Sequence, residues 1–384
     1  MQADKYKLEI KLSIQEIRKD NWDNLFGNID NPFFDWTWLD NLERSQSVAR
    51  KTGWQPLYFI ASEKNELYAI APLFLKNHSY GEFIFDHNFI RLAEDLNLNY
   101  YPKLIGMSPY SPIEGYQFIY RNDSNKIELT NFLIDNIEKF AIRNNILSCN
   151  FLYVNDSWSQ YLEMLGYHDW LNIRSEWEWN GENKFEDFLA RFNSNQRRNI
   201  KKERKSISKQ NITINTYSKE NINEEIIKNM YYFYEKHCLK WGIWGSKYLT
   251  FEFFKNCIEN KNKLLFFSAF QDTAENPIAM SMFIKNNENL WGRYWGSNDD
   301  INNLHFELCY YQPIEWAINN KIKRFDPGAG GNQKRRRGFY AKETKSMHKW
   351  FNRNMDNIIS EWLIKANKKT INEIKIENNS IPFI

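Results

Sequence analysis

The sequence predicts an α/β protein with mixed sheets, built from two domains in tandem. The chain has 384 residues, more than one ordinary hydrophobic core takes up. Hydrophobic residues make up 42% of it, with 15 Trp, 21 Tyr and 28 Phe, which excludes general disorder. Each half also shows the same order of predicted elements: a helix, strands, a crossover helix and a further strand. We expect the domains to be residues 1–180 and 181–384.

Charge and cysteine usage narrow the class of protein. The 51 Lys and Arg nearly balance the 48 Asp and Glu, so the net charge of +3 gives no global reason to expect nucleic acid or a membrane as partner. No stretch approaches the roughly 20 apolar residues of a spanning helix, and the first residues do not form a signal peptide. The four cysteines are scattered without a CxxC pair. We therefore expect a cytoplasmic protein with no membrane insertion and no metal.

The first half predicts helices and strands around one loop-rich stretch. Residues 100–115 contain three prolines and two glycines, so they predict a structured loop, in which Lys103 is a candidate contact for an anion. The other elements are helices at 31–50, 124–144 and 157–165, and strands at 56–62, 67–76, 116–120, 147–154 and 173–179.

Residues 78–86 carry most of the ionisable groups of this half. As a strand, the segment places His78, Glu82 and Asp86 on one face. At about 3.3 Å per residue, His78 and Glu82 are roughly 13 Å apart. These side chains form no catalytic triad unless Gly81 bends the strand.

The second half begins with a dense run of Lys and Arg. Residues 184–210 predict two helices with a break near 193–195, and Glu203 is the only acidic residue between 191 and 209. The run is either a solvated helix face or an electrostatic clamp for phosphate, a polyanion or RNA. Further predicted elements are helices at 223–241, 250–260 and 346–366, and strands at 212–217, 264–271 and 277–285.

The stretch 291–331 predicts the central element of the second half. It reads as a strand with Arg293 and Tyr294, a polar turn, a helix over 304–319, and a strand that ends at Asp326 before three glycines. Apolar residues on both sides of the helix predict that it is buried. Glu307 and Glu315 lie on one of these sides, and a buried carboxylate needs a partner.

We expect that partner of Glu307 to be Arg293. His305 points about 200° away from Glu307 on a regular helix, so these two cannot form an acid/base pair. Pro313 removes an amide inside the helix and should kink it.

Several motifs of this sequence resemble a known family. They are LHFELCYYQPIEWAI with GRYWG before it and RGF after it, KNHSYGEFIFD (76–86), YYPKL (100–104) and TGW (52–54). Together they resemble the FemAB-like family of N-acyltransferases, which is loosely assigned to peptidoglycan biosynthesis, from about Asn31 to Trp350. The resemblance implies two GNAT-like acyltransferase units in tandem and transfer of an acyl group to an amine.

The resemblance, together with the residue chemistry, indicates the candidate site. Candidates for catalysis are Glu82, His78, Glu307 and His305. Candidates for substrate binding are Asp86, Lys103, Tyr101, Arg293, Tyr294, Lys334, Arg337 and His348. Gln333 stands where the family pattern leads us to expect His.

Donor and acceptor remain open at this point. The sequence has no Ser–His–Asp pattern, Walker motif or Rossmann glycine motif, so we do not expect covalent catalysis. GNAT enzymes that use coenzyme A have a glycine-rich basic loop before the crossover helix, whereas this chain has Asp299 and Asp300 there. The donor is acyl-CoA or aminoacyl-tRNA, and the acceptor a small molecule or a cell-envelope precursor. The alternative is a non-catalytic protein that binds RNA or an anionic precursor through 191–209.

Overall fold

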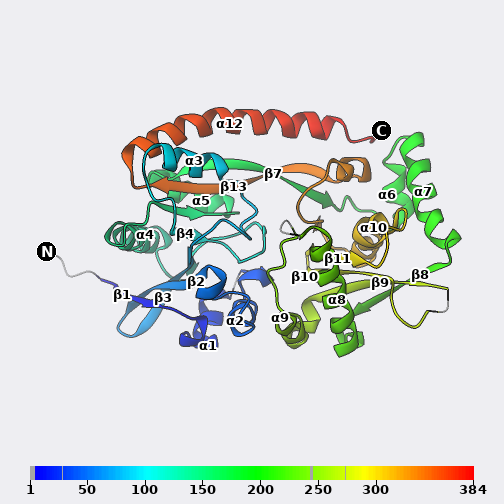
Figure 1. The fold of residues 1–384 in the computed structure, drawn as a ribbon, viewed down its shortest axis with the longest axis horizontal. Coiled ribbons are helices and arrows are strands. Elements are labelled where there is room, and N and C mark those ends of the chain that lie inside the picture. The colour runs from blue at the N-terminus through cyan, green and yellow to red at the C-terminus, as the bar shows by residue number, and fades with distance from the viewer. Residues whose placement is uncertain (1–4, 28, 243–244, 273) are drawn as a thin grey trace. The chain divides into compact units, whose positions relative to one another are not determined.

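The computed structural model describes residues 5–27, 29–242, 245–272 and 274–384, which form two compact units (Figure 1). Unit 1 contains residues up to 172 together with 344–371, and unit 2 contains 173–343 together with 372–384. The division falls inside three elements: β7 (His168–Glu178), β13 (Tyr340–Trp350) and α12 (Arg353–Asn379). The sequence analysis divided the chain between 180 and 181 and did not include the return of 344–371 to the first unit.

Unit 1 has a mixed sheet in which antiparallel strands precede one parallel crossover. Its strands are β1 (Lys7–Lys11), β2 (Trp54–Glu63), β3 (Glu66–Lys76), β4 (Lys103–Gly106), β5 (Ile119–Tyr120) and β6 (Ser148–Phe151). Strands β1, β2 and β3 pair antiparallel, and β3 pairs with both β4 and β5. Helix α4 (Lys126–Arg143) then leads to β6, which pairs parallel with β4 and antiparallel with residues 347–350 of β13.

The remaining helices of unit 1 are short. They are η1 (Ile14–Glu16), α1 (Lys19–Phe26), η2 (Pro32–Phe34), α2 (Trp36–Arg44), η3 (Arg50–Thr52), α3 (His87–Asp95) and α5 (Asp156–Met164). Asn side chains cap the start of several helices, as Asn125 does for α4 by accepting from the Glu128 amide.

Unit 2 repeats the strand order of unit 1. Strands β8 (Ile212–Ser218), β9 (Leu264–Gln271), β10 (Ala279–Lys285) and β11 (Asn289–Ser297) pair antiparallel in sequence. A crossover helix then leads to β12 (Arg324–Asp326), which pairs parallel with β11 and antiparallel with β7. Each sheet therefore has four antiparallel positions, a crossover helix and a parallel strand.

The other helices of unit 2 lie before β8 and between β8 and β9, or follow β12. They are α6 (Phe185–Ala190), α7 (Ser194–Lys209), η4 (Lys219–Asn221), α8 (Glu224–Lys240), α9 (Phe251–Asn256), η6 (Cys257–Lys263) and η8 (Asn332–Arg337). Helix α8 lies against β10 and β11 (Figure 1). The break between α6 and α7 confirms the predicted break near 193–195.

The crossover helix of unit 2 contains a widened turn. It consists of α10 (Leu304–Phe306), a π-helical turn at Glu307–Tyr311 and α11 (Gln312–Asn319). A regular helix would place the Pro313 ring against the carbonyl of Cys309. Instead the Gln312 amide donates to the carbonyl five residues back, at Glu307, and the free Leu308 carbonyl accepts from Ser281 Oγ at 2.9 Å. The predicted disturbance at Pro313 is thus a π-turn.

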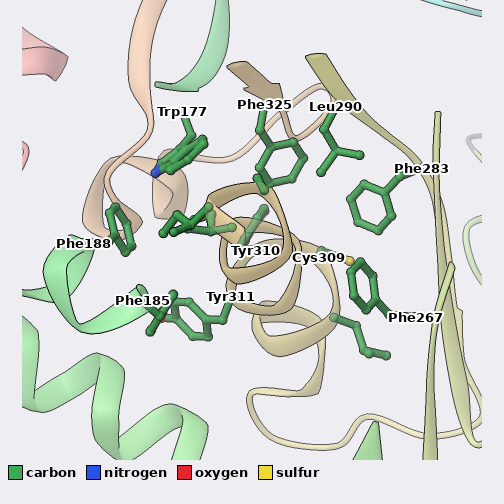
Figure 2. Close-up of a cluster of buried hydrophobic side chains, with 14 of the residues drawn as sticks. Trp177, Phe185, Phe188, Phe267, Phe283, Leu290, Cys309, Tyr310, Tyr311 and Phe325 are labelled. Carbon is green, nitrogen blue, oxygen red and sulfur yellow. The ribbon is translucent and has the colours of Figure 1, made fainter. Parts of the chain in front are cut away.

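The core of unit 2 surrounds this crossover helix on both sides (Figure 2). Figure 2 shows aromatic rings of β7, α6, β9, β10 and β12 directed at the helix, among them Trp177, Phe188, Phe267, Phe283 and Phe325. Leu304, Leu308, Tyr311, Ile314 and Ile318 are all buried, which confirms the predicted burial of the helix. Burial of apolar surface contributes about 25 cal/mol per Å² to the free energy of folding, and it is the dominant favourable contribution for this unit.

Three local predictions were wrong. Residues 78–86 form a loop rather than a strand, because the backbone turns at Gly81 (φ +82°) and Phe83 (φ +59°). Lys103 lies in β4 rather than in a loop. Residues 346–350 belong to β13, and the C-terminal helix begins only at Arg353. Lys103 and residues 346–350 are in strands because they pair with strands far away in the sequence, and residues 78–86 are not a strand because they have no such partner among the described residues. Strand pairing therefore outweighed the local sequence pattern.

The described residues include no helix long and apolar enough to cross a membrane. The four cysteines are all buried and free. Within the described part of the chain, no group of three or more His, Cys, Asp or Glu side chains has metal-binding geometry.

The close packing of α8 on β11 gives a stability prediction. A Cβ at Gly296 would lie 2.1 Å from the Phe233 carbonyl oxygen, so Gly296→Ala must displace backbone. We expect a destabilisation of about 1–3 kcal/mol, measured by chemical denaturation. Gly27→Ala is the control, because its Cβ would meet only ordinary contacts from 3.5 Å. Equal stability of the two variants would contradict this packing.

Candidate functional site

The candidate residues of unit 1 meet in one buried cluster. Lys76 ends β3, Lys103 begins β4, and Glu82 and Asp86 come from the loop between β3 and α3. Their exposed fractions are 0%, 2%, 1% and 4%, respectively. We call these four residues the lysine–carboxylate cluster. Two cations and two anions are thus removed from water together, which requires close pairing.

Lys103 holds both carboxylates of this cluster. Its Nζ lies 2.7 Å from Glu82 Oε2 and 2.5 Å from Asp86 Oδ2. Burial works to lower the pKa of Lys103, but the two carboxylates outweigh it and raise the pKa. Asp86 has a lowered pKa, because Lys103 and hydrogen bonds outweigh its burial. For Glu82 burial dominates and raises the pKa.

Lys76 is less well compensated than Lys103. Its Nζ lies 3.9 Å from Glu82 Oε1, which has no hydrogen-bond partner within the described structure. Burial lowers the pKa of Lys76 to about 6, only partly offset by Glu82. The ring of Trp54 lies 3.7 Å from the same Nζ and supplies a cation–π contact. Lys76 was not among the predicted residues, because only strand register brings it to the cluster.

Hydroxyl groups connect the cluster toward the surface. Ser79 Oγ donates to Asp86 Oδ2 at 2.7 Å and lies 2.9 Å from the hydroxyl of Tyr101. The Tyr100 hydroxyl also donates to Asp86 Oδ2, at 2.7 Å. Since Ser79 and Tyr101 are partly exposed, they form the outer end of this network.

The two candidate histidines of unit 1, His78 and His348, have different surroundings. His78 Nε2 lies 3.0 Å from the Thr52 carbonyl, and its Nδ1 accepts from Lys76 and from the Tyr80 amide, so both ring nitrogens are occupied. His348 lies on β13, where its Nδ1 donates to Asn150 Oδ1 at 2.8 Å. Burial, and next the charge of Lys103, lower the pKa of His348 to about 3. Its Nε2 has no hydrogen-bond partner among the described residues.

In unit 2 the partner of Glu307 is Arg204, not Arg293 as predicted. Arg204 on α7 donates from Nη2 at 2.9 Å and from Nε at 3.0 Å to Glu307 Oε1, and Gln312 donates to the same oxygen. Arg204 also reaches Glu315, whose side chain is 38% exposed and therefore only partly buried. Burial raises the pKa of Glu307 even though Arg204 opposes this. The prediction missed Arg204 because it lies within the basic run.

A second ion pair connects α7 with η8. Arg337 Nη2 donates to both oxygens of Glu203, at 2.9 and 3.0 Å, and the guanidinium carbon lies 3.3 Å from the centre of the Phe306 ring. Glu203 also accepts from the hydroxyl of Tyr311. Lys334 is buried, and its Nζ donates to the Gly328 carbonyl at 2.5 Å. Burial lowers the pKa of Lys334 to about 8.

Strand β12 ends while its neighbour β11 continues. They pair from Asn289 with Arg324 to Trp291 with Asp326, after which β12 ends and β11 continues to Ser297. Arg293 is the bulged residue between the two registers of β11 with β10. Tyr294, partly buried, packs against the rings of Tyr234 and Phe254. β11 thus has no β12 partner beyond Trp291.

His305 lies in the aromatic surroundings of this strand end. Its ring is 5.0 Å from that of Trp295 and 5.3 Å from that of Tyr310. Burial, and next the charge of Arg337, lower the pKa of His305 to about 4. With this pKa the imidazole is neutral at pH 7, and no described residue forms a hydrogen bond to its nitrogens.

Helix α7 presents a row of cations on its outer side. Arg198, Lys201, Lys202, Lys205 and Lys209 are exposed and follow an i, i+3, i+4, i+7, i+11 spacing. None of them has an ion-pair partner among the described residues. We call these five residues the basic stripe. Ile200 and Ile207 are buried on the opposite side, and Glu203 and Arg204 anchor the helix there.

A family model named FemAB-like, described as peptidoglycan biosynthesis/recognition, matches residues 13–384. The chain belongs to the FemAB-like family. It is therefore an acyl- or aminoacyltransferase of a peptidoglycan-related process, which confirms the predicted enzyme class. No curated protein sequence matches this chain significantly.

Solved structures support the fold of this FemAB-like protein. FemX is 12% identical with a TM-score of 0.53, and the match covers 92% of this chain and 100% of FemX. L-PGS from Bacillus licheniformis is 7% identical with a TM-score of 0.50, covering 84% and 95%. A tandem GNAT protein from the clavulanic acid biosynthesis pathway also matches, at 8% identity and a TM-score of 0.46, covering 90% and 98%. The likeness to FemX and L-PGS, together with the strand order that the two units share, confirms the predicted fold of two tandem GNAT-like units.

The ion pair of Glu307 gives a second prediction. Glu307→Gln leaves Arg204 without its main counter-ion, so we expect a loss of roughly 3 kcal/mol, the lower end for a broken buried pair, because Arg204 keeps Glu315. Glu315→Gln, which removes the more exposed carboxylate from the same arginine, should cost clearly less. Chemical denaturation measures both, and a Glu307→Gln variant as stable as the wild type would contradict the pairing.

The buried imidazole of His348 gives a prediction for pH. Its folded pKa of about 3 lies below the ordinary 6.5, so its contribution to stability is complete above pH 6.5 and is lost as the pH falls toward 3. Over that window the free energy of unfolding should fall by about 1.4 kcal/mol per pH unit more in the wild type than in His348→Gln. NMR should show no titration of His348 between pH 5 and 8. A midpoint near 6.5 would show that the ring is solvated.

Proposed function

We propose that this protein transfers an aminoacyl group from aminoacyl-tRNA to a primary amine of an anionic cell-envelope precursor. The observation that carries the proposal is that β11 continues beyond its last pair with β12 and that the ring of His305 lies 5.0 Å from Trp295 on this continuation. Backbone amides at such a strand end can hold the oxyanion of a tetrahedral adduct. Both substrates are made in the cytoplasm, so we also propose a cytoplasmic location.

The chemistry requires the acceptor nitrogen to attack the ester carbonyl and then lose a proton. The nitrogen of the tetrahedral adduct is far more acidic than a free ammonium, so a neutral imidazole can accept its proton. We assign this role to His305, because its pKa of about 4 keeps it neutral at pH 7 and no described residue occupies its nitrogens. The imidazolium then gives this proton to the tRNA ribose oxygen, which leaves as a hydroxyl group as its bond to the carbonyl carbon breaks, and an amide bond remains.

The other candidate residues of unit 2 have supporting roles in this proposal. We assign contacts with the donor to Arg293, at the bulge of β11 against β10, and to Lys334, whose pKa burial lowers to about 8. Arg337 and Glu307 act indirectly, because both are held in ion pairs with α7 and so position the crossover helix. Tyr294 supports Arg293, whose guanidinium carbon lies 5.4 Å from its ring centre.

In unit 1, we propose that the lysine–carboxylate cluster belongs to acceptor binding. Glu82 and His78 were candidates for the base, but Glu82 is buried against Lys103 and both nitrogens of His78 are occupied. Tyr101 at the outer end, with Asp86 and Lys103 behind it, is better placed to bind the acceptor. His348 supports the sheet beside the cluster through Asn150.

Two observations favour aminoacyl-tRNA over acyl-CoA as donor. The basic stripe offers unpaired cations along about 16 Å of helix, since each residue advances the helix by about 1.5 Å, which suits successive phosphates of an RNA backbone. The loop before α10 instead contains Asp299 and Asp300, both exposed, with Asp300 paired to Lys240. Negative side chains there disfavour the pyrophosphate of coenzyme A.

The experiment compares the two donors on one protein. Purified protein is incubated with aminoacyl-tRNA or with acetyl-CoA and longer acyl-CoAs, and with an amine-bearing precursor, and amide product is measured. We expect product only from aminoacyl-tRNA. Product from a thioester, or a saturable thermal shift with one, would contradict the proposed donor.

Neutralising the basic stripe tests how the donor is held. The triple variant is Arg198→Gln, Lys201→Gln, Lys205→Gln. In it the plot of log affinity for tRNA against log salt concentration should become less steep by about 2 to 3 units, because each cation that contacts a phosphate contributes roughly 0.7 to 0.9 to the steepness. Lys365→Gln with Lys368→Gln, on the exposed side of α12, is the control.

The same experiment tests the alternative function. A non-catalytic protein that recognises RNA or an anionic precursor through α7 would lose binding in the triple variant and would form no product with any donor. Product formation by the wild type excludes that alternative.

A further inference from the structure

The strand register of unit 1 places two buried lysines directly opposite each other. Strands β3 and β4 pair antiparallel with Lys76 across from Lys103, so both side chains project from the same face of the sheet. Like charges directly opposite in a sheet repel each other. With exposed fractions of 0% and 2%, water does not screen this repulsion. The pair therefore requires an anion.

In this structure one short loop segment supplies that anion. The polar groups around Lys76 are His78 Nδ1 at 3.2 Å, the Tyr80 carbonyl at 3.0 Å and Glu82 Oε1 at 3.9 Å. All three belong to residues 78–82, whereas both lysines are on paired strands. The sheet thus fixes the two cations, and a loop without regular structure neutralises them.

Three features of this loop indicate that a ligand could displace it from the two lysines. Phe83, an aromatic residue, has φ +59°, a strained conformation that the surrounding structure must maintain. Tyr80 is 65% exposed and Phe85 is 77% exposed, so the loop presents large aromatic side chains to water. Glu82 Oε1 also has no hydrogen-bond partner in the described structure, so the loop satisfies Lys76 incompletely.

We propose that Lys76 and Lys103 form an anion-binding site, and that residues 78–82 occupy it internally until a ligand carboxylate or phosphate takes their place. When the segment withdraws, Lys103 keeps Asp86, and the incoming anion holds the proton of Lys76, which burial would otherwise leave neutral at pH 7. With Lys76 protonated, the site has a net charge of +1 and suits one monoanionic group. The anion site is inferred from the structure alone. The identification of its natural ligand as part of the acceptor substrate rests on the proposed function.

Anion binding can be measured without knowing the natural ligand. The probes are sodium acetate and inorganic phosphate, each compared with sodium chloride at equal ionic strength, and the readouts are thermal melting and hydrogen exchange of residues 77–86. In the wild type we expect a saturable rise in melting temperature together with faster exchange of the loop. Acetate acting alone identifies a carboxylate site, and phosphate acting alone a phosphate site.

Three variants separate this site from a purely structural cluster. Glu82→Gln removes the charge of the internal occupant, so it should bind the probe at least tenfold more tightly than the wild type, equivalent to about 1.4 kcal/mol. Lys76→Met removes one cation and should abolish the effect of the probe. Glu94→Gln, an exposed carboxylate on α3, is the matched control and should behave as the wild type.

The outcomes are decisive in each direction. Acetate and phosphate could stabilise Glu82→Gln but leave the wild type unchanged. Glu82 would then be a permanent counter-ion of the lysines that no ligand displaces, and the proposal would be overturned. A probe effect that persists in Lys76→Met places the anion elsewhere and also overturns it. Should Glu82→Gln not fold, the wild type and Lys76→Met decide alone. Absence of transfer activity would count against the proposed function but not against the anion site.

Discussion

The widened turn at Glu307–Tyr311 is the constraint on which the arrangement of unit 2 depends. Pro313 prevents regular hydrogen bonding in the crossover helix, and the extra residue in the turn frees the Leu308 carbonyl. Ser281 of β10 donates to that carbonyl and attaches the helix to the sheet. The turn also carries Glu307, so the same irregularity that anchors the helix brings the carboxylate to Arg204.

Helix α7 takes its orientation from this attachment. Two consecutive residues, Glu203 and Arg204, form ion pairs with Arg337 and with Glu307. Breaking either pair would leave a charge without its partner, which is more costly than the pair is stabilising. Because the buried side of α7 is held in this way, its exposed cations form a continuous row. The basic stripe is therefore a consequence of packing at the π-turn.

The two units share a strand order but differ at the end of the strand that begins the parallel pair, which is β4 in unit 1 and β11 in unit 2. In unit 1, the space beside Gly106 is filled by the ring of Tyr116, which stacks on Phe151 and forms a bridge to Val154. In unit 2, β11 continues beyond the end of β12. One topology thus contains two different environments: a sheet with buried ion pairs in unit 1, and in unit 2 a strand that continues unpaired with β12, with the His305 ring 5.0 Å from its Trp295. This difference is why we place acyl transfer in unit 2.

The sequence by itself determined the two-unit α/β fold, the burial of the crossover helix and the break in the basic run, because hydrophobic periodicity and helix breakers act locally. It also indicated Glu82 and Asp86, although on a wrong strand at 78–86, and Lys103, although in a loop rather than in β4. Only the tertiary structure decided that Lys76 joins them, that Arg204 rather than Arg293 binds Glu307, and that residues 346–350 are a strand. These features depend on register and on contacts between residues far apart in the chain, and a buried charge takes whichever partner the fold brings within reach.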